Sequence, residues 1–333
     1  MRFLYLNTRN VYPQDKHLID GLRELGHTVK EVSGTKSLRE NCDAVIVGFT
    51  SPILAIKARL ASPKKIIFNA VMSQYEANVI SRRKYGLFGI RAAKWWFVDF
   101  ASFYLSSIVL LESRAQVEFI SRFFFVPREK LVRSFSGINE KEFFFDQNIK
   151  KKEKFTVLFR GRFLPESGIL TVIETAKKLE KSDIEFLVIG HGFMYREVNA
   201  LMAKLHPKNL TMMNEKLPIE TLRNLMLQSH ISLGQFARHP RLERTLPCKL
   251  FESLALGLPY LTGRNEAVFE ILEENKTCLV VNQADPDSLA RKILELKNDR
   301  EALGRIGKAG HDLYRQKLTS KKLAEDFMNI CFK

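Results

Sequence analysis

Two ionisable residues three positions apart, Lys249 and Glu252, are the strongest candidates for chemistry in this sequence. They lie in the run LERTLPCKLFESLALGLPY (242–260), where polar residues lead into a helix that a Gly-x-Pro ends. Residues three apart share a helix face, and the free N–H groups and dipole at a helix N-terminus favour an anion. A phosphate can bind beside Lys249 while Glu252 accepts from a sugar hydroxyl. The alternative is a solvated i, i+3 ion pair.

A second candidate is the turn RGRFLPESG (160–168), which joins a strand to a helix. Small residues such as Gly161 let the backbone approach a ligand, and Arg162 adds a planar cationic fork. A simple tight turn explains the same residues. Gly190-His191-Gly192 is weaker still, because it lacks the third glycine of a dinucleotide-binding fingerprint.

Metal and cofactor sites are not expected. Asp285-Pro286-Asp287 has the spacing of an Asp-x-Asp metal site, yet a capping Asp followed by Pro at the first helical position explains it without a metal. The seven histidines show no ligand spacing. The four cysteines are far apart and form no C-x-x-C pair, which argues against zinc, a redox motif and a disulfide framework: Cys42, Cys248, Cys278 and Cys331.

The charge balance points to an anionic partner. Lys and Arg number 53 against 37 Asp and Glu, a net charge of +16, which suits nucleic acid, phospholipid or a phosphorylated substrate. We expect no nucleic acid, because the positive charge is spread over both halves and no recognised nucleic-acid-binding module appears.

One segment, 82–97, combines basic and aromatic residues without an acid and holds both tryptophans. This pattern suits a membrane or acceptor patch at anionic lipids, the alternative being a packed helix with solvated charges. The patch consists of Arg82, Arg83, Lys84, Arg91, Lys94, Trp95 and Trp96.

The following apolar run, WWFVDFASFYLSSIVLL (95–111), has a length at the lower limit for a membrane span. Asp99, Ser102 and Ser106 recur at i, i+3 and i+7, which favours an amphipathic helix of a soluble domain followed by a buried strand, 107–111. The N-terminal residues lack the apolar core and cleavage site of a secretory signal, so we expect a cytoplasmic protein, peripheral on the cytosolic face of a membrane.

Short β-branched runs alternate with helical patterns, which predicts an α/β protein with parallel sheets. Strands are expected near 3–6, 27–32, 44–49, 66–69, 108–111, 131–135, 155–159, 186–189, 210–213, 230–233 and 259–262, and helices near 17–25, 169–179, 196–205, 219–227, 249–256 and 318–331. The pattern stops between 144 and 153. We therefore predict two doubly wound domains, 1–148 and 149–316, facing a shared cleft, with a C-terminal helix, 317–333, able to pack back on the first.

Together these segments resemble the retaining nucleotide-sugar glycosyltransferases of family 4, which have the GT-B fold of two Rossmann-like domains. The resemblance is strongest from about Phe155 to Tyr314. It rests on VLFRGRFLPESGILTVIETAKKL, FLVIGHG and LPCKLFESLALGLPYLTG, with LVRSFSGINEKEFF in the first half.

The resemblance implies roles for single residues. Glu252 matches the second glutamate of the family's paired motif, which holds the ribose, and Arg162 matches the arginine that stabilises the donor diphosphate. The first glutamate is replaced by Arg244, with Glu243 beside it, and the phosphate-binding lysine is Ser167 here. Lys249 and Arg244 are then candidates for the missing positive charge, and the resemblance implies no metal.

The sequence therefore predicts a glycosyltransferase that moves a sugar from a nucleotide-sugar donor to a glycan or lipid-linked acceptor, for a cell-surface polysaccharide or glycolipid. Cationic groups and helix N-termini stabilise the diphosphate leaving group of such a reaction. Two alternatives stay open: a nucleotide-sugar epimerase of related fold, and a non-catalytic protein that binds anionic lipid or nucleic acid.

Overall fold

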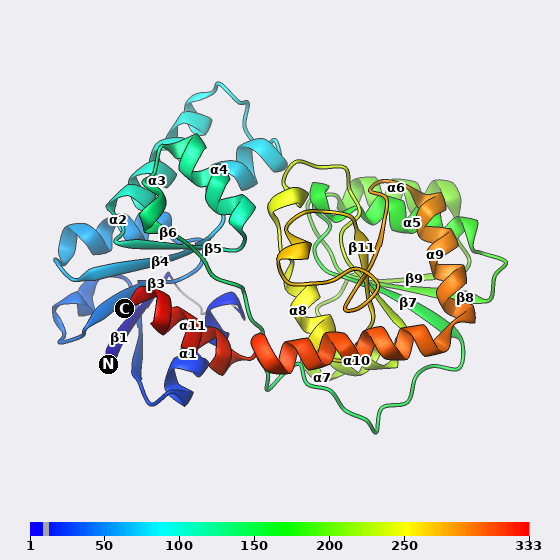
Figure 1. Cartoon of the computed structure of the whole chain (residues 1–333). Helices are drawn as coiled ribbons and strands as arrows, with labels where there is room; N and C mark the ends of the chain where they lie inside the picture. The colour runs from blue at the N-terminus through cyan, green and yellow to red at the C-terminus, as the bar shows by residue number, and fades with distance from the viewer. Residues whose placement is uncertain (9–12, 333) are drawn as a thin grey trace. The chain divides into compact units, whose positions relative to one another are not determined.

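The computed structural model describes residues 1–8 and 13–332 and divides the chain into two compact units (Figure 1). Unit 1 comprises Met1–Asn139, Arg244–Leu246 and Lys317–Lys333, and unit 2 comprises Glu140–Glu243 and Pro247–Gln316. The first division falls before the expected position 148. Phe143 accounts for this, because its ring is buried and lies 5.7 Å from the guanidinium of Arg160 in unit 2.

Unit 1 is built on a parallel sheet of six strands in the order β2-β1-β3-β4-β5-β6. The strands are β1 Arg2–Asn7, β2 Thr28–Ser33, β3 Ala44–Val47, β4 Lys65–Val71, β5 Ile108–Leu111 and β6 Leu131–Arg133. Central strands such as β3 are apolar on both sides, as a sheet covered on both faces requires. The predicted doubly wound α/β architecture is confirmed for this unit.

Helices cover both faces of this sheet. They are α1 Pro13–Glu24, α2 Pro52–Ala61, α3 Ile90–Leu105, α4 Arg114–Phe124 and α11 Ser320–Cys331. Side chains alternate along a strand, so Phe3 and Tyr5 pack with α1 and α11, while Leu4 and Leu6 pack with α2, α3 and α4.

The α1–α11 contact depends on a glycine. Gly21 of α1 lies so close to α11 that a Cβ atom there would come 2.1 Å from the Ser320 carbonyl oxygen and 2.9 Å from the Ala324 Cβ. The two helices lie side by side (Figure 1), and α11 closes the core over β1 with Phe327.

Unit 2 repeats the architecture with strand order β12-β11-β10-β7-β8-β9, again all parallel. Its strands are β7 Phe155–Arg160, β8 Ile184–Ile189, β9 Leu210–Met213, β10 Ile231–Leu233, β11 Tyr260–Gly263 and β12 Leu279–Val281. Its helices are α5 Ile169–Lys178, α6 Tyr195–Leu205, α7 Ile219–Gln228, α8 Cys248–Ala255, α9 Pro286–Asn298 and α10 Arg300–Lys317. Sequence reasoning missed β12, whose three residues are too few to show a pattern.

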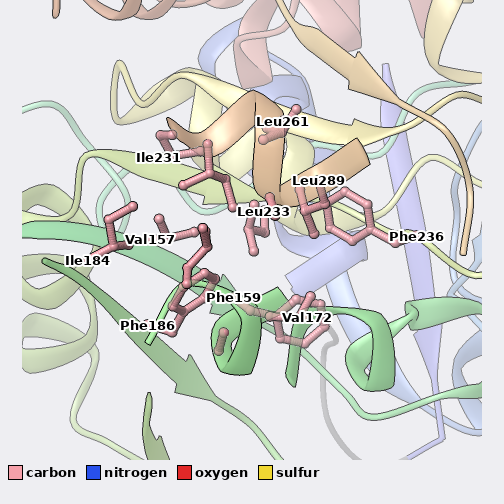
Figure 2. Close-up of a cluster of buried hydrophobic side chains, with 14 of the residues drawn as sticks. Val157, Phe159, Val172, Ile184, Phe186, Ile231, Leu233, Phe236, Leu261 and Leu289 are labelled. Atoms are coloured by element: carbon pink, nitrogen blue, oxygen red, sulfur yellow. The ribbon is translucent and has the colours of Figure 1, made fainter. Parts of the chain in front are cut away.

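Figure 2 shows the apolar core of unit 2. Val157 and Phe159 of β7 lie among buried side chains from β8, β10 and β11 and from helices such as α5 and α9. This packed layer fixes the ends of the strands, and with them the loops that carry the polar residues described below.

Helix α3 corrects one prediction. Asp99, Ser102 and Ser106 do form a stripe, but all three are buried, while Phe97 and Tyr104 point outward. The polar groups are satisfied inside the unit: the Asp99 carboxylate accepts from the Ser73 hydroxyl and the Tyr75 amide, both at 2.7 Å. Burial raises the pKa of Asp99 to about 7.

Within residues 1–8 and 13–332, no helix is both long and apolar enough to cross a membrane.

We expect Gly21→Ala to lower the unfolding free energy of unit 1 by about 1–3 kcal/mol, because the added methyl group forces α1 away from α11. Urea unfolding followed by tryptophan fluorescence measures this, since both tryptophans lie in α3. The matched control is Gly304→Ala in α10, where an added Cβ meets nothing within 4 Å. It should leave stability unchanged or raise it, by up to about 1 kcal/mol. Equal midpoints for wild type and Gly21→Ala would contradict the packing described for α1.

Candidate active site

The candidate site forms where the strand order of unit 2 reverses. Strand β7 lies between β8 and β10, so the chain runs outward in one direction and then returns to the other side of β7. Loops diverge at such a switch point and leave room for a ligand at the carboxyl ends of the strands. Arg160 ends β7, Gly234 follows β10, and α8 comes next along this edge.

Glu252 is fixed by an arginine that sequence reasoning missed. Arg160 Nη1 donates to Glu252 Oε1 at 2.6 Å and also contacts Oε2, and the carboxylate is only 5% exposed. The alternative of a solvated Lys249–Glu252 pair is therefore wrong. The sequence did hold a signal for this residue, because Arg160 is a charged residue at the end of an otherwise largely apolar strand. A carboxylate has about four lone-pair sites, so Glu252 retains capacity to accept from a ligand hydroxyl.

Lys249 lies buried in the same cluster. Its Nζ donates to the Gly234 carbonyl at 3.0 Å and sits 3.6 Å from the centre of the Phe159 ring. Burial first and the nearby Arg160 guanidinium second lower the pKa of Lys249 from its ordinary 10.5 to about 7, with Glu252 partly offsetting both. An ammonium so poorly solvated gains strongly from an anionic ligand.

The glycine turn adjoins this lysine. A Cβ at Gly161 would lie 3.1 Å from Lys249 Cε and 3.4 Å from Nζ, so the bare backbone leaves space beside the amine. Gly190 supports the turn, because a Cβ there would meet the Gly161 carbonyl oxygen at 1.9 Å. Arg162 is exposed next to it. Gly190-His191-Gly192 thus serves close packing of this loop.

Glu243 lines a hollow of about 640 Å³, whose lining residues do not include Lys249 or Glu252. Gln283 Nε2 donates to Glu243 Oε1 at 2.7 Å, and the Glu266 amide donates to Oε2 at 3.2 Å. The loops after β11 and β12 therefore hold both carboxylate oxygens. Polar side chains of both charges line the rest of the hollow, including Arg238, Arg264, Asn282 and Asp285.

Arg244 belongs to unit 1 rather than to the unit 2 cluster, and its side chain is engaged there; its expected role at the donor stays a prediction. Its Nε and Nη2 donate to Glu76 Oε1 at 3.0 and 2.6 Å, and its guanidinium lies 4.2 Å from the Phe119 ring centre. Glu76 is fully buried and also accepts from Gln116 Nε2 at 2.8 Å. A buried carboxylate needs a cationic partner, and Arg244 supplies it within unit 1.

Ser167, which stands at the family's lysine position, is buried and holds a loop. Its carbonyl accepts from the Phe236 amide at 3.2 Å. Beside it, Arg241 Nε donates to Glu166 at 3.2 Å, with both side chains 5% exposed. Sequence reasoning missed this buried ion pair, because its partners are far apart along the chain.

The Asp285-Pro286-Asp287 segment is a helix cap. The Asp285 carboxylate accepts from the Ser288 amide at 2.8 Å, and Pro286 begins α9. In the described part of the chain no three His, Cys, Asp or Glu residues gather in a way that could hold a metal ion.

Unit 1 has its own switch point, between β1 and β3, and polar groups collect there too. The buried Asp15 carboxylate accepts from Tyr5 Oη at 2.6 Å, Asn69 Nδ2 at 2.9 Å and the Phe49 amide at 3.0 Å. Burial and the Asp15 charge raise the pKa of Tyr5 well above its usual range. Sequence reasoning missed this cluster, although Asn69 at the end of an apolar strand was a visible signal.

The basic segment 82–97 has most of its charged side chains exposed and its two tryptophans half-buried. Arg83, Lys84, Arg91 and Lys94 are exposed and Arg82 is half-buried. Trp95 and Trp96 are half-buried against the core, and Trp96 stacks on Phe100 with ring centres 5.3 Å apart; their place in the patch stays a prediction.

Two doubly wound domains, one with a cationic cluster beside a glycine turn at its switch point, define a protein of the GT-B class. Comparison with known sequences identifies the family: residues 140–312, just over half of the chain, match the profile of Glycosyl transferases group 1. The chain belongs to this family.

Curated relatives are also glycosyltransferases by name. The chain is 24% identical over 159 residues to uncharacterized glycosyltransferase MJ1178 and 23% identical over 250 residues to MJ1607, both of Methanocaldococcus jannaschii. These matches cover 48% and 70% of this chain but only 43% and 62% of the relatives. Amylovoran biosynthesis glycosyltransferase AmsK of Erwinia amylovora is 22% identical over 174 residues, 51% of this chain and 42% of AmsK.

Solved structures agree on the fold. Alr3699/HepE of Anabaena in complex with UDP-glucose has a TM-score of 0.77 at 11% identity, over 99% of each chain. WaaG, a glycosyltransferase involved in lipopolysaccharide biosynthesis, has a TM-score of 0.71 at 14% identity, also over 99% of each chain. The predicted GT-B fold is confirmed.

Replacing Arg244 tests its place in unit 1. We expect Arg244→Met to lower the unfolding free energy by about 3–5 kcal/mol, because it leaves the Glu76 carboxylate buried and unpaired. The double variant Arg244→Met/Glu76→Gln should recover part of this loss. Arg305→Met removes an exposed pair with Glu301 and is the control, with a loss below about 1 kcal/mol. If Arg244→Met unfolds like wild type but loses nucleotide affinity, the arginine belongs to the donor site after all.

The Lys249 amine predicts a pH dependence. Its pKa of about 7 in the folded protein lies below the ordinary 10.5, so the ammonium that attracts a diphosphate disappears as pH rises above 7. The affinity for an added nucleoside diphosphate should fall there by up to about tenfold per pH unit. Lys249 in the unfolded chain binds more protons between pH 7 and 10.5, so its contribution to stability rises over the same range. Calorimetric titration at several pH values tests the binding, and the same slope in Lys249→Met would exclude Lys249 as its cause.

Proposed function

We propose that this protein is a retaining glycosyltransferase of family 4 that moves a sugar from a nucleotide-sugar donor to a glycan or lipid-linked acceptor. The observation that carries the proposal is the cluster of Lys249, Arg160 and Glu252 beside the open Gly161 turn at the switch point of unit 2. Membership of the glycosyl transferase group 1 family and the nucleotide sugar bound by HepE support it.

The cluster suits a diphosphate leaving group. When the bond between the anomeric carbon and the diphosphate breaks, negative charge grows on the departing phosphate while the sugar becomes oxocarbenium-like. Lys249 and the N-terminus of α8 lie where they can neutralise that charge, with the exposed Arg162 beside them. The acceptor oxygen forms the new glycosidic bond and its proton leaves with the diphosphate.

Glu252 and Glu243 are proposed to orient the donor. Glu252 accepts from a ribose hydroxyl while Arg160 holds it in place. Glu243, held by Gln283 and the Glu266 amide, accepts from hydroxyls of the transferred sugar. Because these groups and Lys249 supply both charge and orientation, the proposed reaction uses no metal ion or other cofactor.

The acceptor belongs to unit 1 in this proposal. We infer that the basic residues of segment 82–94 bring the protein to an anionic membrane on its cytosolic face, where a lipid-linked acceptor is available. The proposed product is a cell-surface polysaccharide or glycolipid, in keeping with the roles given to AmsK and WaaG.

A donor screen tests the assignment. We expect one of the UDP, GDP or dTDP sugars to stabilise the protein in thermal unfolding and to be consumed only when acceptor is present, with or without EDTA, and the product to keep the donor's anomeric configuration. Conversion of the sugar nucleotide without any acceptor would point to an epimerase. No response to any sugar nucleotide, with salt-dependent binding to DNA or RNA, would point to a non-catalytic binder.

Two variants test the residues. Lys249→Met and Glu252→Gln should each lower turnover by about 10²- to 10³-fold while the protein stays folded, because each removes a group that contacts the donor. Lys308→Met in α10 is the matched control, since its side chain is 79% exposed and pairs only with Asp312 among the contacts described. Turnover near the wild-type rate in both site variants would remove the proposed role of this cluster.

A further inference from the structure

Unit 1 carries an unusual group of outward apolar side chains between β4 and the end of α3. Phe88 is fully exposed and Ile90 is 90% exposed, and Leu87 and Phe97 are more than half exposed. Large apolar side chains this exposed and this close together along the chain indicate a place where another apolar phase or partner binds.

A hydrogen-bonded turn holds two of these side chains at the surface. The Gly89 amide donates to the Gly86 carbonyl at 3.1 Å, which closes a turn with Leu87 and Phe88 at its two central positions. Gly89 is also the N-cap of α3. The glycines on either side leave nothing that could cover the two apolar side chains.

The base of the turn is anchored. Tyr85 packs against the core of unit 1, and the Lys84 and Arg91 cations lie 5.7 and 5.6 Å from its ring centre. The turn is therefore held out from the domain by a fixed aromatic residue with a cation on each side.

The charges around the turn favour an anionic membrane as its binding partner. From Ala77 to Val98 there are five basic residues and no acid, and the acids at either end, Glu76 and Asp99, are buried. An apolar tip with cations set behind it matches the layers of an anionic bilayer, where acyl chains lie beneath phosphates. On α3 the outward Lys94 and Phe97 continue this pattern.

We propose that the turn 86–90 inserts Leu87, Phe88 and Ile90 into the acyl layer of an anionic membrane while the flanking lysines and arginines bind lipid phosphates. The inference deepens the proposed function and rests on it for the acceptor. In this inference the apolar contact with the membrane is made by Leu87, Phe88 and Ile90, which sequence reasoning did not single out, and not by the two tryptophans.

The test uses the full chain with vesicles of phosphatidylcholine, alone or with phosphatidylglycerol. Wild type should bind the anionic vesicles, and part of the binding should survive about 1 M salt, where the Debye length is about 3 Å and charge attraction is screened. Trp95 and Trp96, the only tryptophans, adjoin the turn through α3, so lipids brominated near the headgroup end of the acyl chain should quench their fluorescence.

Variants separate insertion from charge attraction. Leu87→Ser/Phe88→Ser should weaken vesicle binding by about a hundredfold and abolish the salt-resistant part, because two apolar side chains no longer leave water. Arg83→Gln/Lys84→Gln should weaken low-salt binding by about fivefold per charge and keep the salt-resistant part. The matched control is Ile219→Ser, an exposed apolar residue of α7 in unit 2, which should bind like wild type.

Absence of binding to anionic vesicles at low salt overturns the inference. It is equally overturned if all binding disappears at high salt and the Leu87→Ser/Phe88→Ser variant matches wild type. Thermal stabilisation by UDP, GDP and dTDP sugars, measured on the same preparations, separates the two proposals: a response to one of them without vesicle binding defeats this inference alone, and vesicle binding without a response to any of them defeats the proposed donor site alone.

Discussion

The proposed chemistry depends on keeping one lysine amine, that of Lys249, out of water. Lys249 is surrounded by the Gly234 carbonyl, the Phe159 ring and the space beside Gly161, and none of these carries a full negative charge. Glu252 is near, but its carboxylate is already engaged by Arg160. The cluster therefore has an excess of positive charge at low solvation, which a diphosphate can neutralise and water cannot.

The parallel sheet supplies the rigid support that keeps Lys249 buried. Strands β7 and β10 end beside each other although 70 residues separate Arg160 from the start of strand β10 at Ile231, and the apolar core beneath them fixes both ends. Gly161 and Gly190 then bring two loops into backbone contact, which leaves no freedom for the turn to collapse onto the amine. The strand ends and the glycine loops therefore keep water away from Lys249, and α8 places its side chain among them.

Much of this was predictable from sequence. The alternation of strand and helix patterns predicted every strand of both sheets except β12, and the helix carrying Lys249 and Glu252, because those signals are local. Arg160 and the Arg241–Glu166 pair were missed, since their partners lie 92 and 75 residues away. Arg244 was assigned to the donor because it stands at a motif position, but motif spacing says nothing about the buried Glu76 that binds it.

Helix α3 shows why the helical spacing of polar residues does not by itself say which side of the helix faces water. Polar residues at helical spacing usually face water, yet a buried carboxylate is stable when donors surround it, and Ser73 and the Tyr75 amide do so for Asp99. With the polar stripe committed to the interior, the opposite face of α3 carries Phe97 and Tyr104. A helix oriented in this way leaves apolar and basic side chains together at the surface. The exposed turn before α3, with Leu87 and Phe88, extends this apolar and basic surface.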